Sequence, residues 1–111
     1  MAENLEPERV ARNESMFREV NERIAESAGR IGAGDAEFVC ECADPACVTR
    51  VQATLEEYER VRADGATFLL APGHEEPGLE AVVEREDEHS VVEKTDPQAE
   101  PVARELDPRT V

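Results

Sequence analysis

The only three cysteines of this 111-residue chain lie within eight positions of one another, at Cys40, Cys42 and Cys47. Cysteines with unrelated structural roles would be scattered along the chain, so the clustering indicates one common role. A disulfide framework favours an even number of cysteines in an exported protein. The first ten residues carry Glu rather than the basic and then apolar regions of a signal peptide. We therefore expect three reduced thiols that act together.

A Cys-x-Cys-x4-Cys segment is best explained by a soft divalent metal ion, because thiolates bind Zn²⁺ strongly and a tetrahedral site needs one more ligand. The two histidines, His74 and His89, are the candidate nitrogen donors. His74 follows a Pro-Gly turn after an apolar segment, where ligand loops commonly project. His89 lies within a predicted hairpin strand, behind three acids. The sequence thus predicts a Cys₃His zinc site made of Cys40, Cys42, Cys47 and His74.

Three other interpretations of the same residues stay open. A Cys₃His set that begins Cys-x-Cys resembles the ligand pattern of the CDGSH-type iron–sulfur proteins, which implies a [2Fe–2S] cofactor, although Cys47 is closer here and no Asp-Gly-Ser-His follows it. The cysteines also suit a thiol redox switch, in which Cys40 or Cys42 pairs with Cys47 after zinc is lost. The third interpretation is three buried cysteines without a ligand.

The core that this composition allows is thin. Hydrophobic residues make up 40% of the chain but aromatic residues only 4%, so the core depends on Val, Leu, Ala and four rings: Phe17, Phe38, Tyr58 and Phe68. A structural zinc contributes roughly 10–16 kcal/mol in small domains, comparable to the stability of a whole domain. We expect the metal to act as a staple for one small domain, residues 1–94.

The order of predicted elements indicates an α+β fold with a short antiparallel or mixed sheet. The elements are a helix, two strands, a short helix, a strand and a hairpin, at residues 6–28, 37–42, 47–53, 55–63, 67–71 and 80–94. Thr54 and Glu57 match a capping box at the start of the short helix. Proline-containing residues 95–111 read as a mobile or loosely docked acidic tail with one helical turn at most.

The long N-terminal helix is amphipathic. Its apolar residues recur at helical spacing, at Val10, Phe17, Val20 and Ile24. Packing of this face against the protein's own sheet is our first interpretation. The sevenfold spacing of Val10, Phe17 and Ile24 also fits a short coiled-coil seam, so a homodimer through residues 6–28 is the alternative.

The formal charge of -15 restricts the partners of the chain. It repels nucleic-acid phosphates and anionic lipids, and no stretch approaches the roughly 20 apolar residues of a membrane span. We therefore expect no direct binding to nucleic acid and no binding to membranes. We expect the partner to be a basic protein. Of the 12 basic residues only Lys94 is lysine, which fits codon bias in a GC-rich genome or adaptation to high salt.

The sequence offers little for catalysis. It lacks a Gly-x-Ser-x-Gly elbow and a phosphate-binding glycine loop, and Pro77 prevents His74 from starting a helical His-Glu-x-x-His motif. A zinc site closed by four protein ligands performs no Lewis-acid chemistry. We expect a non-catalytic zinc-binding module for protein interaction or regulation. A thiol or zinc redox sensor ranks second, and an enzyme with an open zinc position ranks third.

Five segments carry a resemblance: residues 17–24, Phe38-Val39-Cys40-Glu41-Cys42, residues 55–59, Pro72-Gly73-His74-Glu75 and residues 91–94. Together they resemble an uncharacterised family of small acidic Cys/His-containing proteins from actinobacteria. The resemblance implies a free-standing cytoplasmic protein from a GC-rich bacterium, and it supplies no activity.

Overall fold

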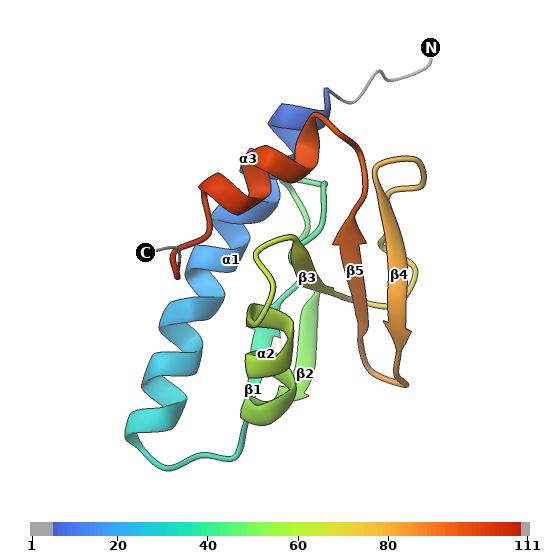
Figure 1. Cartoon of the computed structure of the whole chain (residues 1–111). Coiled ribbons are helices and arrows are strands. Elements are labelled where there is room, and N and C mark those ends of the chain that lie inside the picture. The colour runs from blue at the N-terminus through green and yellow to red at the C-terminus, as the bar shows by residue number, and fades with distance from the viewer. Residues whose placement is uncertain (1–5, 110–111) are drawn as a thin grey trace.

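The computed structural model describes residues 6–109 of the chain. Residues 1–5, which begin the predicted domain, and residues 110–111, which end the predicted tail, lie outside the described part. Along the chain the elements are α1 (Pro7–Arg30), β1 (Asp35–Val39), β2 (Arg50–Thr54), α2 (Leu55–Arg62), β3 (Thr67–Leu70), β4 (Glu80–Arg85), β5 (Ser90–Lys94) and α3 (Ala99–Glu105) (Figure 1). The predicted α+β class is confirmed.

The strands form two small sheets, and every pairing between them is antiparallel. The hairpin of β1 and β2 makes the first sheet, and β3, β5 and β4 make the second, with β5 in the centre. The β1–β2 ladder ends where Val39 faces Arg50. The predicted strands at 37–42 and 47–53 are therefore too long, because the cysteine segment lies beyond the ladder.

The cysteine segment joins the two sheets. Just past β1, the Cys40 backbone N–H still bonds to the Thr49 carbonyl oxygen across the hairpin, at 3.1 Å. One residue later, the Glu41 N–H bonds to the Leu69 carbonyl oxygen in β3, at 2.8 Å. The chain therefore changes its backbone partner from one sheet to the other between Cys40 and Glu41.

The apolar core lies where the two sheets and α2 meet. Phe38 of β1 stacks on Tyr58 of α2, with ring centroids 4.6 Å apart. The apolar side chains of β2, β3 and β5 surround this pair, among them Val51, Phe68, Leu69, Leu70 and Val92. The predicted capping box is confirmed: Thr54 Oγ1 accepts from the Glu57 N–H, and Glu57 Oε1 accepts from the Thr54 N–H.

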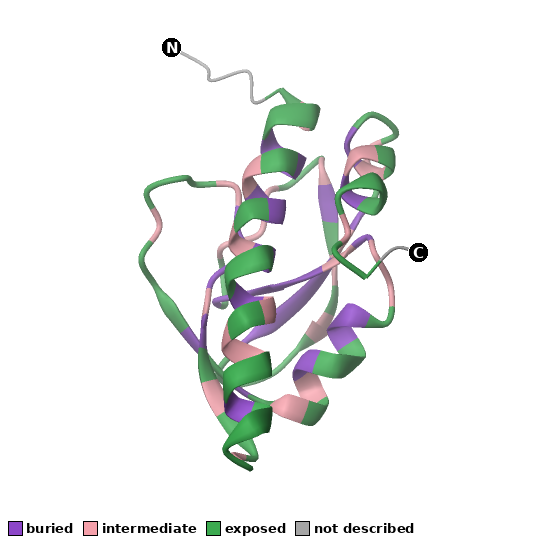
Figure 2. Ribbon diagram, turned by 90° about the vertical axis from the view of Figure 1, so that its left-hand side faces the viewer, coloured by how far each residue is buried: buried purple, intermediate pink, exposed green. Residues whose placement is uncertain are grey.

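The buried face of helix α1 only partly coincides with the one that its apolar pattern predicts. Val10 is buried, but Val20 is 46% exposed and Phe17 is only partly buried. Polar residues take the inner positions, namely Glu14, Ser15, Arg18 and Asn21, so only one narrow face of the helix is buried (Figure 2). The predicted packing is confirmed for Val10 and for Ile24, which packs against the core, and was wrong for Val20. Hydrophobic periodicity missed the polar inner positions because it assumes that charged side chains face water. None of the helices within residues 6–109 combines the length and apolarity needed to cross a membrane.

A buried ionic cluster ties α1 to the second sheet. Lys94 Nζ lies 2.5 Å from Glu14 Oε1 and 2.6 Å from Glu80 Oε1, and none of the three side chains is exposed. Burial, followed by the nearby Glu80, raises the pKa of Glu14 well above its ordinary value, and Lys94 opposes the shift. The single lysine of the chain therefore supplies the cation that makes two buried carboxyl groups tolerable.

The C-terminal segment is folded onto the domain to a greater extent than we predicted. We expected one helical turn at most after residue 95, whereas α3 spans seven residues and buries Ala99 and Ala103. Arg18 of α1 donates to the Ala103 carbonyl oxygen at 2.7 Å. Farther along, Arg109 bonds to Glu22 and Glu59 at 2.8 Å each. The prolines in this segment indicated irregular structure. The contacts that dock it, made by alanines and arginines, leave no periodic pattern in so short a helix.

Candidate metal centre

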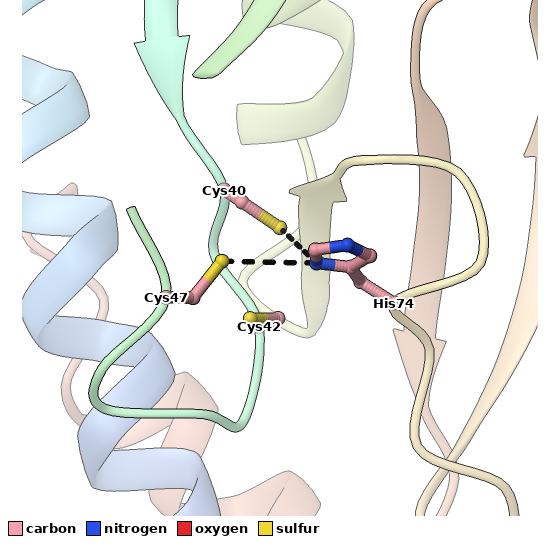
Figure 3. Close-up of side chains that lie close together, drawn as sticks. All are labelled: Cys40, Cys42, Cys47 and His74. Atoms are coloured by element: carbon pink, nitrogen blue, oxygen red, sulfur yellow. Dashed lines mark hydrogen bonds between the residues drawn. The ribbon is translucent and has the colours of Figure 1, made fainter. Parts of the chain in front are cut away.

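The four predicted ligands come from two loops that meet between the sheets. Cys40 and Cys42 follow β1, Cys47 precedes β2, and His74 lies in the turn after β3. Figure 3 shows the sulfurs of Cys40 and Cys47 facing the imidazole of His74, with Cys42 beside them. The three sulfurs and the imidazole nitrogen all lie within 4.8 Å of one another. The structure thus brings together every residue that the sequence singled out.

The spacing of these atoms suits a single tetrahedral ion. Zinc–sulfur and zinc–nitrogen bonds of roughly 2.3 and 2.05 Å at tetrahedral angles give sulfur–nitrogen distances of about 3.5 Å and sulfur–sulfur distances of about 3.8 Å. His74 Nδ1 lies 3.4 Å from Cys40 Sγ and 3.7 Å from Cys47 Sγ. The widest separation in the group, 4.8 Å, exceeds the tetrahedral edge by about 1 Å.

Two tight turns deliver Cys47 and His74 to the site. Asp44 reverses the chain after Cys42: its Oδ1 accepts the Ala46 N–H at 2.9 Å, and its carbonyl oxygen accepts the Cys47 N–H at 3.1 Å. The second turn closes with a 3.1 Å bond from the His74 N–H to the Ala71 carbonyl oxygen. Gly73 in that turn has a φ of 84°, a conformation that side chains disfavour.

The sulfurs share their protons unevenly. A hydrogen bond from Cys40 lowers the pKa of Cys42 to about 5, with further help from His74 and against the effect of burial. The same hydrogen bond, together with burial, raises the pKa of Cys40. In addition, the Ala71 backbone N–H donates to Cys40 Sγ at 3.2 Å. The lowered pKa of Cys42 favours its thiolate, which is the form that binds metal.

The site lies at the edge of the core. Cys40 and Cys42 are buried, whereas Cys47 and His74 are half-buried. All three cysteines are free thiols. An ion reaching this site from solvent would meet Cys47 and His74 first, and it would then be enclosed by four protein ligands. Such a closed set suits structural binding rather than Lewis-acid chemistry.

His89, the alternative nitrogen donor, is not part of the group. It is 2% exposed and lines a different hollow, beside Asp35 and Glu57. Within residues 6–109, the Cys₃His set is the one group of histidine, cysteine and acidic side chains close enough to hold a metal ion. The preference for His74 over His89 agrees with this placement.

The sequence analysis missed the polar side chains that support the cysteine segment. Asn13 and Asn21 of α1 and Glu41 between the two ligand cysteines all bond to this segment or to its neighbours. Nothing in the helix pattern distinguished the two asparagines from solvent-facing residues. The one available signal was the position of Glu41, because a residue between two metal ligands influences the direction of the backbone at both of them.

Comparison with known proteins returned no match: no family model, curated protein or solved structure is similar to the chain. The function must therefore be argued from the site itself.

Proposed function

We propose that this protein is a non-catalytic zinc-binding module in which Cys40, Cys42, Cys47 and His74 hold one structural Zn²⁺. The observation that carries the proposal is the set of ligand distances, with Nδ1 of the imidazole 3.4 and 3.7 Å from two sulfurs. Bound zinc would link the β1–β2 hairpin to the turn after β3. It would thereby join the two sheets at the edge of the core that they share.

Zinc suits the spacing better than a [2Fe–2S] cluster does. A binuclear cluster divides its four ligands between two irons separated by bridging sulfides. Ligands on opposite irons then lie much farther apart than ligands on one ion. Here all four donor atoms lie within 4.8 Å of one another. The compact arrangement supports a mononuclear site.

The role of the module in this proposal is protein interaction or regulation, with a basic protein as partner. The support is the formal charge of -15, which speeds encounter with a basic surface and makes binding sensitive to salt. The closed ligand set argues for a domain that zinc holds in shape, with recognition left to its surface. The resemblance to small actinobacterial proteins stays a prediction, as does a cytoplasmic location.

A thiol redox sensor is the second candidate, and one observation favours it. Hydrogen bonding lowers the pKa of Cys42 to about 5, and the neighbouring Cys47 is only half-buried, so a thiolate lies next to an accessible thiol. Hydrogen peroxide would take two electrons from this pair and form a disulfide, and the proton of the thiol together with one proton from solvent would complete two waters. Zinc would lose two ligands and leave.

The test is the metal content and visible spectrum of the purified protein. We expect one zinc per chain and no colour, with zinc bound more weakly or lost in His74→Ala and bound normally in His89→Gln, which removes the other imidazole. A brown protein would indicate iron and sulfide, and a metal-free protein would refute the proposal. Mild peroxide separates the two candidates: release of zinc with a change in partner affinity supports the sensor, and intact coordination supports the plain module.

A further inference from the structure

The Glu41 side chain is fully buried and bonds to two other elements. Its Oε1 accepts the Leu69 backbone N–H of β3 at 2.9 Å, and its Oε2 accepts from Asn21 Nδ2 of α1 at 2.7 Å. The Glu41 backbone N–H also donates to the Leu69 carbonyl oxygen at 2.8 Å. Backbone and side chain of one residue thus fix its position against β3, midway between Cys40 and Cys42.

Asn21 completes the edge of β1 that the hairpin leaves open. Because Cys40 bonds across the hairpin to Thr49, the amide and carbonyl of Val39 point to the other side. There Asn21 Oδ1 accepts the Val39 N–H, and Asn21 Nδ2 donates to the Val39 carbonyl oxygen, both at 2.8 Å. The asparagine side chain therefore acts as a one-residue strand partner immediately before the first ligand.

Asn13 holds the segment on the far side of the second ligand. Two turns earlier on α1, its Nδ2 donates to the carbonyl oxygen of Ala43 at 3.3 Å, and it lies 3.5 Å from that of Cys42. Helix α1 therefore contacts the segment at three points. These are the Val39 backbone before Cys40, the Glu41 side chain between the two cysteines, and the Ala43 carbonyl oxygen after Cys42.

Burying the carboxylate of Glu41 costs free energy, which a purely structural contact would not require. A fully buried carboxylate loses its hydration, and its hydrogen bonds to the Leu69 N–H and to Asn21 Nδ2 offset part of that loss. What the buried carboxylate provides is orientation of the backbone beside the ligands. Glu41 and Asn21 determine the direction of the backbone at both flanking cysteines, and metal sites depend on such outer contacts to orient their ligands.

We propose that Asn21 and Glu41 are positioning residues of the metal centre, which hold Cys40 and Cys42 in the geometry that one ion requires and couple metal affinity to the docking of α1. The inference rests on the proposed zinc site and deepens it. Loss of the contact is expected to weaken zinc affinity roughly 10–100-fold, the usual effect of removing an outer contact to a ligand.

The test compares Glu41→Gln with Tyr58→Phe in the full chain. Glu41→Gln keeps the size of the side chain but places an amide N–H₂ against the donors of Asn21 or Leu69. Tyr58→Phe removes a different core hydrogen bond, from the Tyr58 hydroxyl to Glu22 at 2.6 Å, and leaves the ligand loops untouched. Zinc affinity is measured by chelator competition, unfolding by urea, and site geometry by the absorption spectrum of the Co²⁺ form.

We expect Glu41→Gln to bind zinc at least 10-fold more weakly than Tyr58→Phe after correction for their stabilities, and to alter the Co²⁺ spectrum. Equal zinc affinity in the two variants, with an unchanged spectrum, would overturn the inference while leaving the zinc site intact. If Glu41→Gln does not fold, Asn13→Ala on the half-buried part of α1 is the substitute, with a smaller loss expected in the same direction. A parent protein that binds no zinc would refute the proposed function itself.

Discussion

Replacing Lys94 with methionine tests how the domain tolerates two buried carboxyl groups. Lys94 Nζ contacts Glu14 and Glu80 at 2.5 and 2.6 Å, and all three side chains are fully buried. Lys94→Met keeps most of the side-chain volume and removes the cation that, among residues 6–109, contacts both carboxyl groups. Removing one partner of a buried ion pair typically costs about 3–5 kcal/mol. That is a large part of the roughly 5–15 kcal/mol of a typical domain.

The pH dependence of this loss has a definite sign. Burial already raises the pKa of Glu14 in the folded state, so folding takes up a proton and stability falls as pH rises above the ordinary pKa of glutamate. Without Lys94 that pKa rises further. The loss in Lys94→Met should therefore be larger at pH 8 than at pH 5.5, as measured by urea unfolding followed by circular dichroism.

A triple variant provides the control. Lys94→Met with Glu14→Leu and Glu80→Gln removes the whole cluster and should recover most of the lost stability, because no charge is left unpaired in the core. A loss below about 1 kcal/mol in Lys94→Met, or one that does not depend on pH, would show that water reaches these groups and that the reasoning is wrong.

Three further predictions concern separate parts of the molecule. Thr54→Ala removes one half of the capping box with Glu57 and should lower the free energy of unfolding by about 1 kcal/mol in urea titrations; no loss would mean that α2 does not depend on its cap. Arg109→Ala breaks the hydrogen bonds to Glu22 and should lower the free energy of unfolding by about 1 kcal/mol, and by less at high salt. A loss that does not change with salt would contradict an ionic origin. In metal-free protein, the 240 nm thiolate absorbance should disappear as the pH is lowered, with a midpoint near pH 5; a midpoint near 8 would refute the lowered pKa of Cys42.

The parts of the fold that were predictable are those with local signals. The capping box at Thr54 fixed the start of α2, and the paired valines of β4 and β5 indicated a hairpin even without a glycine turn. The candidate site was predictable for a similar reason. Three cysteines close in sequence need one common explanation, and the turn at Gly73 was a suitable position for a fourth ligand.

The buried polar groups were not predictable, because their environment is set by distant parts of the chain. Arg18 reads as a solvent-facing residue in the helix pattern, yet it is fully buried and bonds to the carbonyl oxygens of Gly65 and Ala103. Glu14 depends on a lysine 80 residues away in the sequence. Periodicity assigns such residues to the surface, so the predicted buried face of α1 only partly coincides with the true one.

The most direct test of the central claim is X-ray absorption spectroscopy at the zinc edge of the purified protein. The account predicts one zinc per chain with three sulfur neighbours at about 2.3 Å and one nitrogen neighbour at about 2.0–2.1 Å. In His74→Ala the nitrogen contribution should be replaced by a solvent oxygen, or the metal should be lost. A shell of oxygen and nitrogen alone, or fewer than three sulfurs around the ion, would contradict the account.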